Sequence, residues 1–309
     1  MESEFDLFKS NLTLEGSIVG IGTFDGVHLG HRSLVDRVLD RARSTGYPGV
    51  ILTFDPHPKD ILLGKPQPRL GEILTTVSLL APCGLDHMIV IRFTPEFSTW
   101  HPLTFVRDVL VNRLQAREVV VGFNFTFGAG GAGTPQTLNE LGRSHGFKVH
   151  TLDPVRLDGE LVSSSAIRRL ITAGDVRTAA RFLNRPYSIM APVISGEGRG
   201  RQIGFPTANL DVDSERIILP AQGVYRGQAR VRDQETMFPC LVNIGINPTF
   251  VDRSAPPLKV EVHLIGFSDE LVGAPLTVLF EERLRDEKKF PDKEALVAQI
   301  RRDLESVIS

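Results

Sequence analysis

Short apolar runs alternate with amphipathic segments through roughly the first 180 residues of the chain. Runs typical of buried strands are Ser17–Ile21, Val50–Phe54, Asp86–Ile91 and Glu118–Phe123. Apolar residues recur at helical spacing within Ser33–Leu39 and Pro102–Leu114. This alternation predicts a parallel sheet with helices on both faces, in which ligands bind beyond the carboxyl ends of the strands.

The pattern changes after Asn184-Arg185-Pro186, where short runs with apolar residues at every second position begin. The predicted strands are Tyr187–Ile194, Gly223–Val231, Phe238–Ile244, Leu258–Ile265 and Leu276–Leu284. Evenly spaced short strands separated by glycine and proline turns favour an antiparallel barrel or sandwich. An amphipathic helix over Lys293–Val307 closes the chain. We therefore expect two domains, 1–184 with a Rossmann-like α/β fold and 185–309 with an antiparallel β-barrel.

Composition narrows the function classes. The chain has 309 residues, of which 41% are hydrophobic and 23% charged, and a net charge of −2. That charge gives no global attraction to nucleic acid or to an anionic membrane, so we expect neither as a partner. Cys83 and Cys240 lie far apart, no apolar run is long enough to cross a bilayer, and the acidic start is unlike a signal peptide. A cytoplasmic location follows as an expectation, and the sequence leaves homo-oligomerisation open.

The stretch Gly22-Thr23-Phe24-Asp25-Gly26-Val27-His28-Leu29-Gly30-His31 joins a predicted strand to a predicted helix. A helix N-terminus offers unpaired N–H groups to an anion, and glycines let the backbone approach a ligand. His28 and His31 face one side of the first turn, where they could cap the helix, bind a metal or contact phosphate. The stretch resembles the His-x-Gly-His signature of the nucleotidyltransferase superfamily, in its flavin-handling branch. The resemblance implies that both histidines stabilise adenylyl transfer, and that ATP is also bound by Gly22, Phe24, Asp25 and Gly30.

Three further segments extend this resemblance. Asp55-Pro56-His57-Pro58 could be only a rigid turn, but it resembles a Phe-(Glu/Asp)-Pro-His-Pro motif that implies flavin contact by His57. The segment Gly122–Gly128 resembles Gly-x-(Asn/Asp)-Phe-x-Phe-Gly, which implies that Asn124 lines the flavin pocket. The serines at positions 163–165 precede an apolar helical segment and could simply be N-caps. Residues 163–168 also resemble the motif Ser-Ser-Thr-x-Ile-Arg, with serine instead of threonine at position 165. That motif implies that Ser164 and Arg168 hold the triphosphate.

Two features of the first half allow other interpretations of its function. Gly128, Gly130 and Gly133, with Asp153 downstream, fit a dinucleotide fingerprint, but that fingerprint belongs in the first strand–helix turn of a fold. The helix after Thr76 is shorter than is usual in the family, by roughly one turn. A chain whose first domain has lost adenylyl transfer therefore stays a competing interpretation.

In the second half, the stretch from Gly196 to Asn209 is not a Walker loop, because it lacks the Gly-Lys-Ser/Thr ending. Glycines and arginines at Gly198, Arg199, Gly200 and Arg201 suit a cationic phosphate flap. The oxygens of Thr207 and Asn209 suit Mg²⁺. A simple glycine-rich hairpin connection is the alternative. The stretch closely resembles the Gly-x-Gly-Arg-Gly…Gly-Phe-Pro-Thr-Ala-Asn signature of riboflavin kinases.

Other segments agree with the riboflavin kinase resemblance. On alternation alone Glu261 could simply face solvent, whereas the resemblance implies that it is the base which accepts the proton of the substrate hydroxyl. Segments 223–225 and 243–250 resemble the nucleotide-edge strand and the second loop of these kinases. The charges of 284–290 would alone indicate a solvated face, but the segment resembles the flavin-contacting loop, which implies flavin contacts by Arg285 and Phe290.

These motifs occur along the chain in the order in which they occur in the bifunctional prokaryotic FAD synthetases. Together they cover nearly the whole chain, which therefore resembles that family. The family implies phosphorylation of riboflavin to FMN and adenylylation of FMN to FAD with release of pyrophosphate. ATP is then the co-substrate, Mg²⁺ the cofactor, and riboflavin, FMN and FAD the remaining partners. A riboflavin kinase with a non-catalytic first domain and a non-catalytic flavin carrier are the alternatives, although a carrier needs neither a metal ligand nor a base.

Overall fold

A computed structural model describes residues 1–9, 12–196, 198–232, 234–246 and 258–308. It contains two compact units, Met1–Gln67 with Glu72–Ser164, and Pro68–Gly71 with Ser165–Ser309. The packing therefore divides near Ser164, and the domain boundary at residue 184 stays a prediction.

The first unit is built on a parallel sheet of six strands in the order β1-β4-β3-β2-β5-β6. Its strands are β1 Glu2–Phe5, β2 Ser17–Ile21, β3 Gly49–Asp55, β4 His87–Arg92, β5 Ala116–Gly122 and β6 Lys148–Leu152. From β2 the chain continues to β3 and β4 on one side of β2, and it then crosses to β5 on the other side. The strand order therefore reverses beside β2, and in open α/β sheets ligands bind at such a switch point, beyond the carboxyl ends of the strands.

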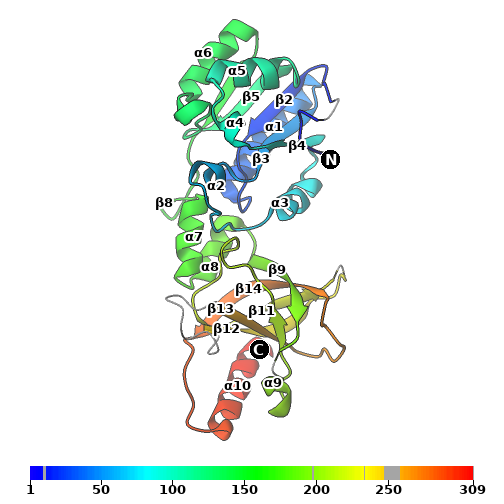
Figure 1. Ribbon diagram of the computed structural model, residues 1–309, viewed down its shortest axis with the longest axis vertical. Helices are drawn as coiled ribbons and strands as arrows, with labels where there is room; N and C mark the ends of the chain where they lie inside the picture. Colours follow the sequence, from blue (N-terminus) through cyan, green and yellow to red (C-terminus); the bar gives the residue numbers. More distant parts are fainter. Residues whose placement is uncertain (10–11, 197, 233, 247–257, 309) are drawn as a thin grey trace. The chain divides into compact units, whose positions relative to one another are not determined.

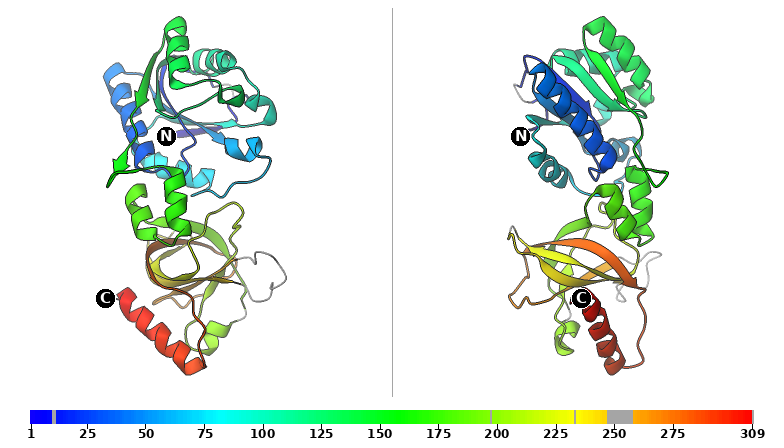
Figure 2. Two further views of the ribbon diagram at one scale, coloured as in Figure 1. Left: turned by 90° about the vertical axis from the view of Figure 1, so that its left-hand side faces the viewer. Right: turned by 180° about the vertical axis from the view of Figure 1, so that it is seen from behind.

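Helices cover both faces of this sheet (Figures 1 and 2). The helical segments are α1 Leu29–Thr45, α2 Pro58–Leu62, α3 Ile73–Leu80, η1 Ala81–Cys83, α4 Pro95–Ser98, α5 Pro102–Phe105, η2 Val106–Val111, η3 Ala129–Gly131 and α6 Pro135–His145. A short hairpin, β7 Arg156–Leu157 with β8 Glu160–Leu161, follows β6. One core packs α1 and α3 against the sheet, and the other packs α5, η2 and α6 against its opposite face. At Gly20 a Cβ atom would collide with Leu34 and Val38, so glycine is what lets α1 pack closely on β2.

The second unit contains a closed antiparallel barrel in the order β10-β13-β12-β11-β14-β9. Its strands are β9 Tyr187–Ile194, β10 Ala208–Leu210, β11 Gly223–Val231, β12 Phe238–Ile246, β13 Leu258–Leu264 and β14 Pro275–Arg285. Its helices are α7 Ser164–Thr172, α8 Val176–Leu183, α9 Arg199–Gln202 and α10 Lys293–Ile308. Alternate residues such as Val260, Val262 and Leu264 fill the barrel interior, and α10 lies against β11 and β12 (Figure 1).

The predicted fold class is confirmed, with a parallel α/β sheet followed by an antiparallel barrel and a terminal helix. One predicted helix differs in detail. The expected helix over Pro102–Leu114 has one α-helical turn and then a π-helical stretch, Val106–Val111, whose buried side chains still face the sheet. None of the described helices combines the length and the apolar character needed to span a bilayer.

Candidate functional site

The turn after β2 brings the two predicted histidines together. His28 is the N-cap of α1, and its Nδ1 accepts a hydrogen bond of 3.3 Å from the backbone N–H of His31. The two rings stack with centroids 3.7 Å apart and planes 14° apart. Because Nδ1 of His28 is an acceptor, a neutral His28 carries its proton on Nε2. That Nε2–H is a donor at the positive end of a helix of 17 residues, as an anion requires.

The backbone of this turn adopts conformations that non-glycine residues rarely take. Phe24 has φ of 49° and Val27 has φ of 41°, a region that costs of order 1–3 kcal/mol per residue. Both side chains are fully buried in the core beneath α1, and the Phe24 ring lies 5.1 Å from that of His31. Burial of these two anchors therefore holds the turn in one shape before any ligand arrives.

Small residues and one hydroxyl complete the turn. A Cβ atom at Gly30 would lie 3.1 Å from the His28 ring, and one at Gly22 would lie 3.2 Å from the Phe24 ring. Ser164 Oγ donates a hydrogen bond of 2.9 Å to the backbone carbonyl of Asp25, whose own side chain is buried. The predicted residues Gly22, Phe24, Asp25, Gly30 and Ser164 are thus brought to one turn.

The other predicted residues of the first half are placed as follows. His57 caps α2, its Nδ1 accepting a 3.1 Å hydrogen bond from the N–H of Lys59, so it shapes its turn whether or not it contacts a ligand. Asn124 is exposed just beyond β5, at the same edge of the sheet as the histidine turn. Arg168 lies on α7 in the second unit, so its role toward the histidine turn stays a prediction.

In the barrel, one row of polar side chains crosses three neighbouring strands. Asn209 on β10 pairs with Glu261 on β13, and Glu261 pairs with Asn243 on β12. Directly paired residues project their side chains from the same face, about 5 Å apart at Cβ. Since Val260 and Val262 point into the barrel, the row faces outward. Glu261 Oε1 lies 2.9 Å from Nζ of Lys259.

The predicted phosphate flap lies beside Thr207. Gly198 begins α9 with φ of 70°, a conformation that favours glycine. A Cβ atom at Gly200 would strike the carbonyl of Phe205 and come within 3.2 Å of Thr207 Oγ1. Arg199 and Arg201 project from α9 and are exposed. Glycine at position 200 is therefore what lets the backbone of α9 approach the Thr207 hydroxyl.

Thr207 and Asn209 have side-chain oxygen atoms of the kind that ligate a magnesium ion. Asn209 is 6% exposed, and none of the described residues hydrogen-bonds to its Oδ1, which is fully buried. An unsatisfied buried oxygen is costly unless a ligand occupies it. The nearby Thr207 hydroxyl supplies a second hard oxygen of the kind that Mg²⁺ prefers.

Comparison with known proteins assigns each half of the chain to a family. Residues 10–166 match the family model of FAD synthetase, and residues 183–309 match that of riboflavin kinase. A bifunctional riboflavin kinase/FMN adenylyltransferase of Listeria monocytogenes is 36% identical over 288 residues, covering 93% of this chain and 90% of the relative. The Escherichia coli K12 protein of the same name is 32% identical over 290 residues, covering 94% and 91%.

The chain belongs to the bifunctional riboflavin kinase/FMN adenylyltransferase family. The predicted resemblance is thereby confirmed. A solved structure from Streptococcus pneumoniae, described as a macrolide-efflux protein, shares the fold over 100% of this chain and 99% of its own, with a TM-score of 0.87 and 27% identity.

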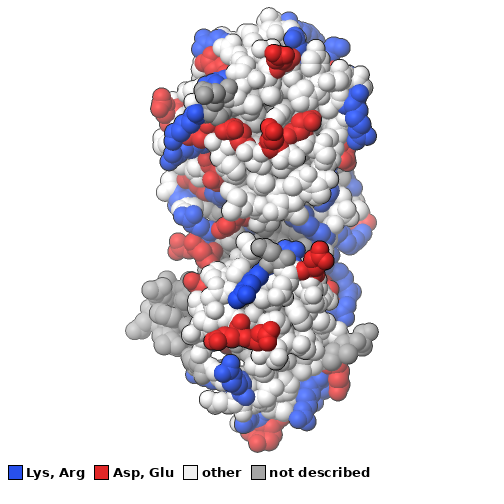
Figure 3. Space-filling view, turned by 90° about the vertical axis from the view of Figure 1, so that its right-hand side faces the viewer, with Lys and Arg blue, Asp and Glu red and all other residues white. Residues whose placement is uncertain are grey.

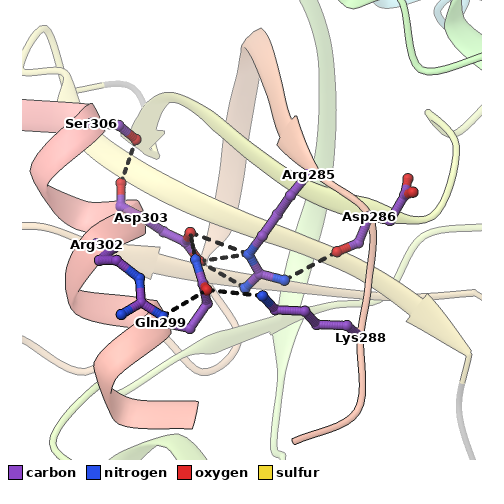
Figure 4. Close-up of polar contacts among 7 residues, drawn as sticks. All are labelled: Arg285, Asp286, Lys288, Gln299, Arg302, Asp303 and Ser306. Carbon is purple, nitrogen blue, oxygen red and sulfur yellow. Dashed lines mark hydrogen bonds and ion pairs between the residues drawn. The ribbon is translucent and has the colours of Figure 1, made fainter. Parts of the chain in front are cut away.

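The flavin contacts expected of this family at Arg285 and Phe290 stay predictions, and the structure shows what else Arg285 does. Its Nη2 lies 2.7 Å from Oδ2 of Asp303 on α10, and both side chains are largely buried. Its guanidinium also lies 5.8 Å from the centre of the Phe290 ring. Figure 4 shows Gln299 of α10 bonded to both Asp303 and Lys288. This cluster fastens segment 285–290 to α10.

The sequence analysis did not predict an aromatic cluster at the carboxyl ends of the strands in the first unit. Rings lie at the end of β3 and just beyond β4 and β5, among them the T-shaped pair Phe54–Phe93 and the stacked pair Phe125–Phe127. Phe123 at the same edge is 44% exposed. Only the recurrence of phenylalanine at strand ends could have indicated this surface. The predicted loop 243–250 is described as far as residue 246; its remainder lies outside the described residues.

Charge at both sites is local rather than a property of the whole surface. On the face seen in Figure 3, Lys and Arg alternate with Asp and Glu without forming a continuous area of one sign. The net charge is −2, so attraction of an anion would have to come from local groups such as the helix N-terminus in one unit and the glycine–arginine flap in the other.

Proposed function

We propose that this chain phosphorylates riboflavin to FMN and adenylylates FMN to FAD, consuming one ATP at each of two separate sites. Both family models are present, and the curated relatives named above carry both activities in their name. The observation that carries the proposal is that each compact unit brings together its own group of residues of the kind that binds phosphate. One is the His28–His31 turn, and the other is the Asn209–Glu261 row, with Thr207 close to Gly200 of α9.

In the barrel, the terminal ribityl hydroxyl of riboflavin would attack the γ-phosphorus of ATP, and ADP would leave. Glu261 would accept the hydroxyl proton, because its carboxylate faces outward in the same row as Asn209. Gly198, Arg199, Gly200 and Arg201 would form the flap over the phosphates. Thr207 and Asn209 would hold Mg²⁺, which when bound neutralises phosphate charge.

In the first unit, a phosphate oxygen of FMN would attack the α-phosphorus of the second ATP, and pyrophosphate would leave. This step needs positioning and charge stabilisation rather than a base. The Nε2–H of His28 would donate to an oxygen of the reacting phosphates, with His31 beside it. Ser164 and Arg168 would hold the rest of the triphosphate. Flavin would lie against the aromatic cluster near Asn124 and His57, since a flat ring system stacks well on aromatic side chains.

The test is to incubate the full chain with riboflavin, ATP and Mg²⁺ and to separate the flavins by chromatography. FMN followed by FAD supports the proposal, and omission of Mg²⁺ should stop FMN formation. FMN alone would instead support a riboflavin kinase with a non-catalytic first domain. The feature that favours this alternative is α3, which is shorter than is usual in the family. Unchanged riboflavin would support a carrier. We also propose a cytoplasmic location, which both free thiols, Cys83 and Cys240, would suit.

A further inference from the structure

His263 links the barrel wall to the segment that carries Thr207. It occupies the outward position that follows Glu261 on β13, and it is half-buried. Its Nδ1 lies 2.7 Å from the backbone carbonyl of Pro206, and Nδ1 is the donor because a carbonyl only accepts. The Phe205 ring meets the imidazole edge-on, with centroids 5.8 Å apart and planes 84° apart. In the part of the chain that the structure describes, the imidazole makes no other hydrogen bond.

The segment that His263 contacts connects α9 to β10. Residues 205–207 lie outside any helix or strand, and Pro206 has no N–H with which to join a strand ladder. The N–H of Phe205 donates a hydrogen bond of 2.9 Å to the carbonyl of Gly200 in α9. A Cβ atom at Gly200 would strike the Phe205 carbonyl and lie 3.2 Å from Thr207 Oγ1. A displacement of this segment would therefore move both α9 and the Thr207 hydroxyl.

We propose that His263 is a positioning residue of the kinase site, which holds segment 205–207 against β13 and thereby fixes Thr207 and the phosphate flap. The inference rests on the proposed roles of Thr207, Arg199 and Arg201 at the phosphates of ATP. β13 pairs with a strand on each side in the closed barrel, so it is a rigid support. A site that is ordered before ATP binds loses less conformational entropy on binding. Loss of the His263 hydrogen bond should therefore appear in the affinity for ATP.

The two ring nitrogens distinguish this role from direct contact with a ligand. With the proton on Nδ1, Nε2 of a neutral ring is an acceptor that faces away from Pro206. Asparagine carries its amide nitrogen as many bonds from Cα as Nδ1, so His263→Asn keeps a donor for the Pro206 carbonyl. Glutamine carries its amide at the level of Nε2, and His263→Leu has neither group. The three variants therefore separate the two nitrogens.

The first measurement is the initial rate of FMN formation by the full chain at one fixed pH, with Mg²⁺ in excess. ATP and riboflavin are varied in turn for the wild type and for His263→Leu, His263→Gln and His263→Asn. Loss of one hydrogen bond changes an equilibrium by roughly three- to tenfold. We expect the KM for ATP to rise by about that factor in the leucine and glutamine variants. The KM for riboflavin should not change, and His263→Asn should resemble the wild type.

The second measurement needs neither substrate nor metal. Trypsin cleaves after arginine, and Arg199 and Arg201 are exposed on α9. Cleavage requires local opening of α9, so it should be about three- to tenfold faster in His263→Leu and His263→Gln, and unchanged in His263→Asn. The fragments are identified by mass spectrometry. Cleavage after Arg216, whose side chain is 68% exposed in the same unit, is the internal reference and should not change.

A matched control is available in the first unit. Nδ1 of His145 lies 2.9 Å from the carbonyl of Leu141, so His145→Leu removes the same kind of hydrogen bond elsewhere in the chain. It should change neither the KM for ATP in FMN formation nor the cleavage of α9. Conversion of FMN to FAD by each sample shows that the first unit is intact.

Several outcomes overturn the inference. Faster cleavage at all three arginines, or an equal rise of both KM values, would mean that His263 only stabilises the barrel. A KM for ATP that rises in His263→Asn as much as in His263→Leu, without faster cleavage of α9, would mean that Nε2 contacts the ligand directly. The proposed function fails separately: if the wild type forms no FMN, the kinase assignment is wrong whatever the cleavage shows. If the wild type forms FMN and all three variants match it in both measurements, only the inference about His263 is refuted.

Discussion

Two arginine–carboxylate pairs of the first unit have nearly the same geometry but differ in burial, and they should differ in their contribution to stability. Arg41 on α1 binds Glu118 on β5 through two hydrogen bonds of 2.7 Å. Arg107 binds Asp108 through bonds of 2.6 and 2.8 Å. The Glu118 side chain is 6% exposed and that of Asp108 is 31% exposed. His150 on β6 also reaches Glu118 Oε2 at 2.6 Å.

The Arg41 hydrogen bonds are the main reason why the pKa of Glu118 is lowered from 4.5 to about 2; burial opposes them and His150 assists them. A difference of that size corresponds to about 3 kcal/mol of native-state stability at neutral pH. Glu118→Gln should therefore lower the free energy of unfolding by about 2 to 3 kcal/mol, or roughly 5 to 10 °C in Tm for a unit of this size. Asp108→Asn should cost less than about 1 kcal/mol.

Urea unfolding followed by tryptophan fluorescence isolates the effect, because Trp100 is the single tryptophan of the chain and lies in the first unit. The native pKa of Glu118 is depressed, so its contribution is complete above pH 4.5 and is lost as pH falls toward about 2. The gap between wild type and Glu118→Gln should close over that range. Equal costs for the two variants, or a gap independent of pH, would refute the reasoning.

Three further substitutions test the sites and the α10 cluster. His28→Ala removes both the helix cap and the Nε2–H donor, so FAD formation from FMN should fall at least about 100-fold while FMN formation persists, as separated flavins would show. Gly200→Ala drives a Cβ atom into the Phe205 carbonyl, so the KM for ATP in FMN formation should rise about tenfold or more with FAD formation unchanged. Asp303→Asn removes the negative charge and one of the two oxygens that bind the largely buried Arg285 and should destabilise the barrel by about 1 to 3 kcal/mol, measured by circular dichroism during denaturation. The first expectation is contradicted if His28→Ala forms FAD at the wild-type rate, and the second if Gly200→Ala keeps the wild-type KM for ATP. The third is contradicted if Asp303→Asn unfolds like the wild type.

Five of the six barrel strands could be predicted from the sequence because apolar residues alternate along them, whereas β10, with three residues that are all buried, has no such pattern and was not predicted. Tyr187–Ile194 and Gly223–Val231 were predicted with the bounds that the structure gives. The same alternation places Glu261 on the outward face, but it cannot show that Asn209 and Asn243 flank it. That neighbourhood depends on the pairing of three strands distant in sequence, which local periodicity does not encode.

Other features of the fold have no hydrophobic pattern in the sequence from which they could be predicted. β1 has four residues, and its Phe5 is 47% exposed, so no hydrophobic period indicates a strand. It is one because its backbone pairs in parallel with β4 at the sheet edge. The attachment of Arg285 to Asp303 was likewise unpredictable, since it joins β14 to a helix that begins eight residues later and packs only in the folded barrel. The His28 cap, by contrast, was predictable because it is local.

The central claim is that two chemically independent ATP sites lie in one chain, and Glu261→Gln tests it most directly. The variant is given riboflavin with ATP and Mg²⁺ in one reaction and FMN with ATP and Mg²⁺ in another, and the flavins are separated over time. We expect no FMN from riboflavin but FAD formation from FMN at the wild-type rate. Loss of both conversions together would contradict the account, because it would mean that the two reactions share a site.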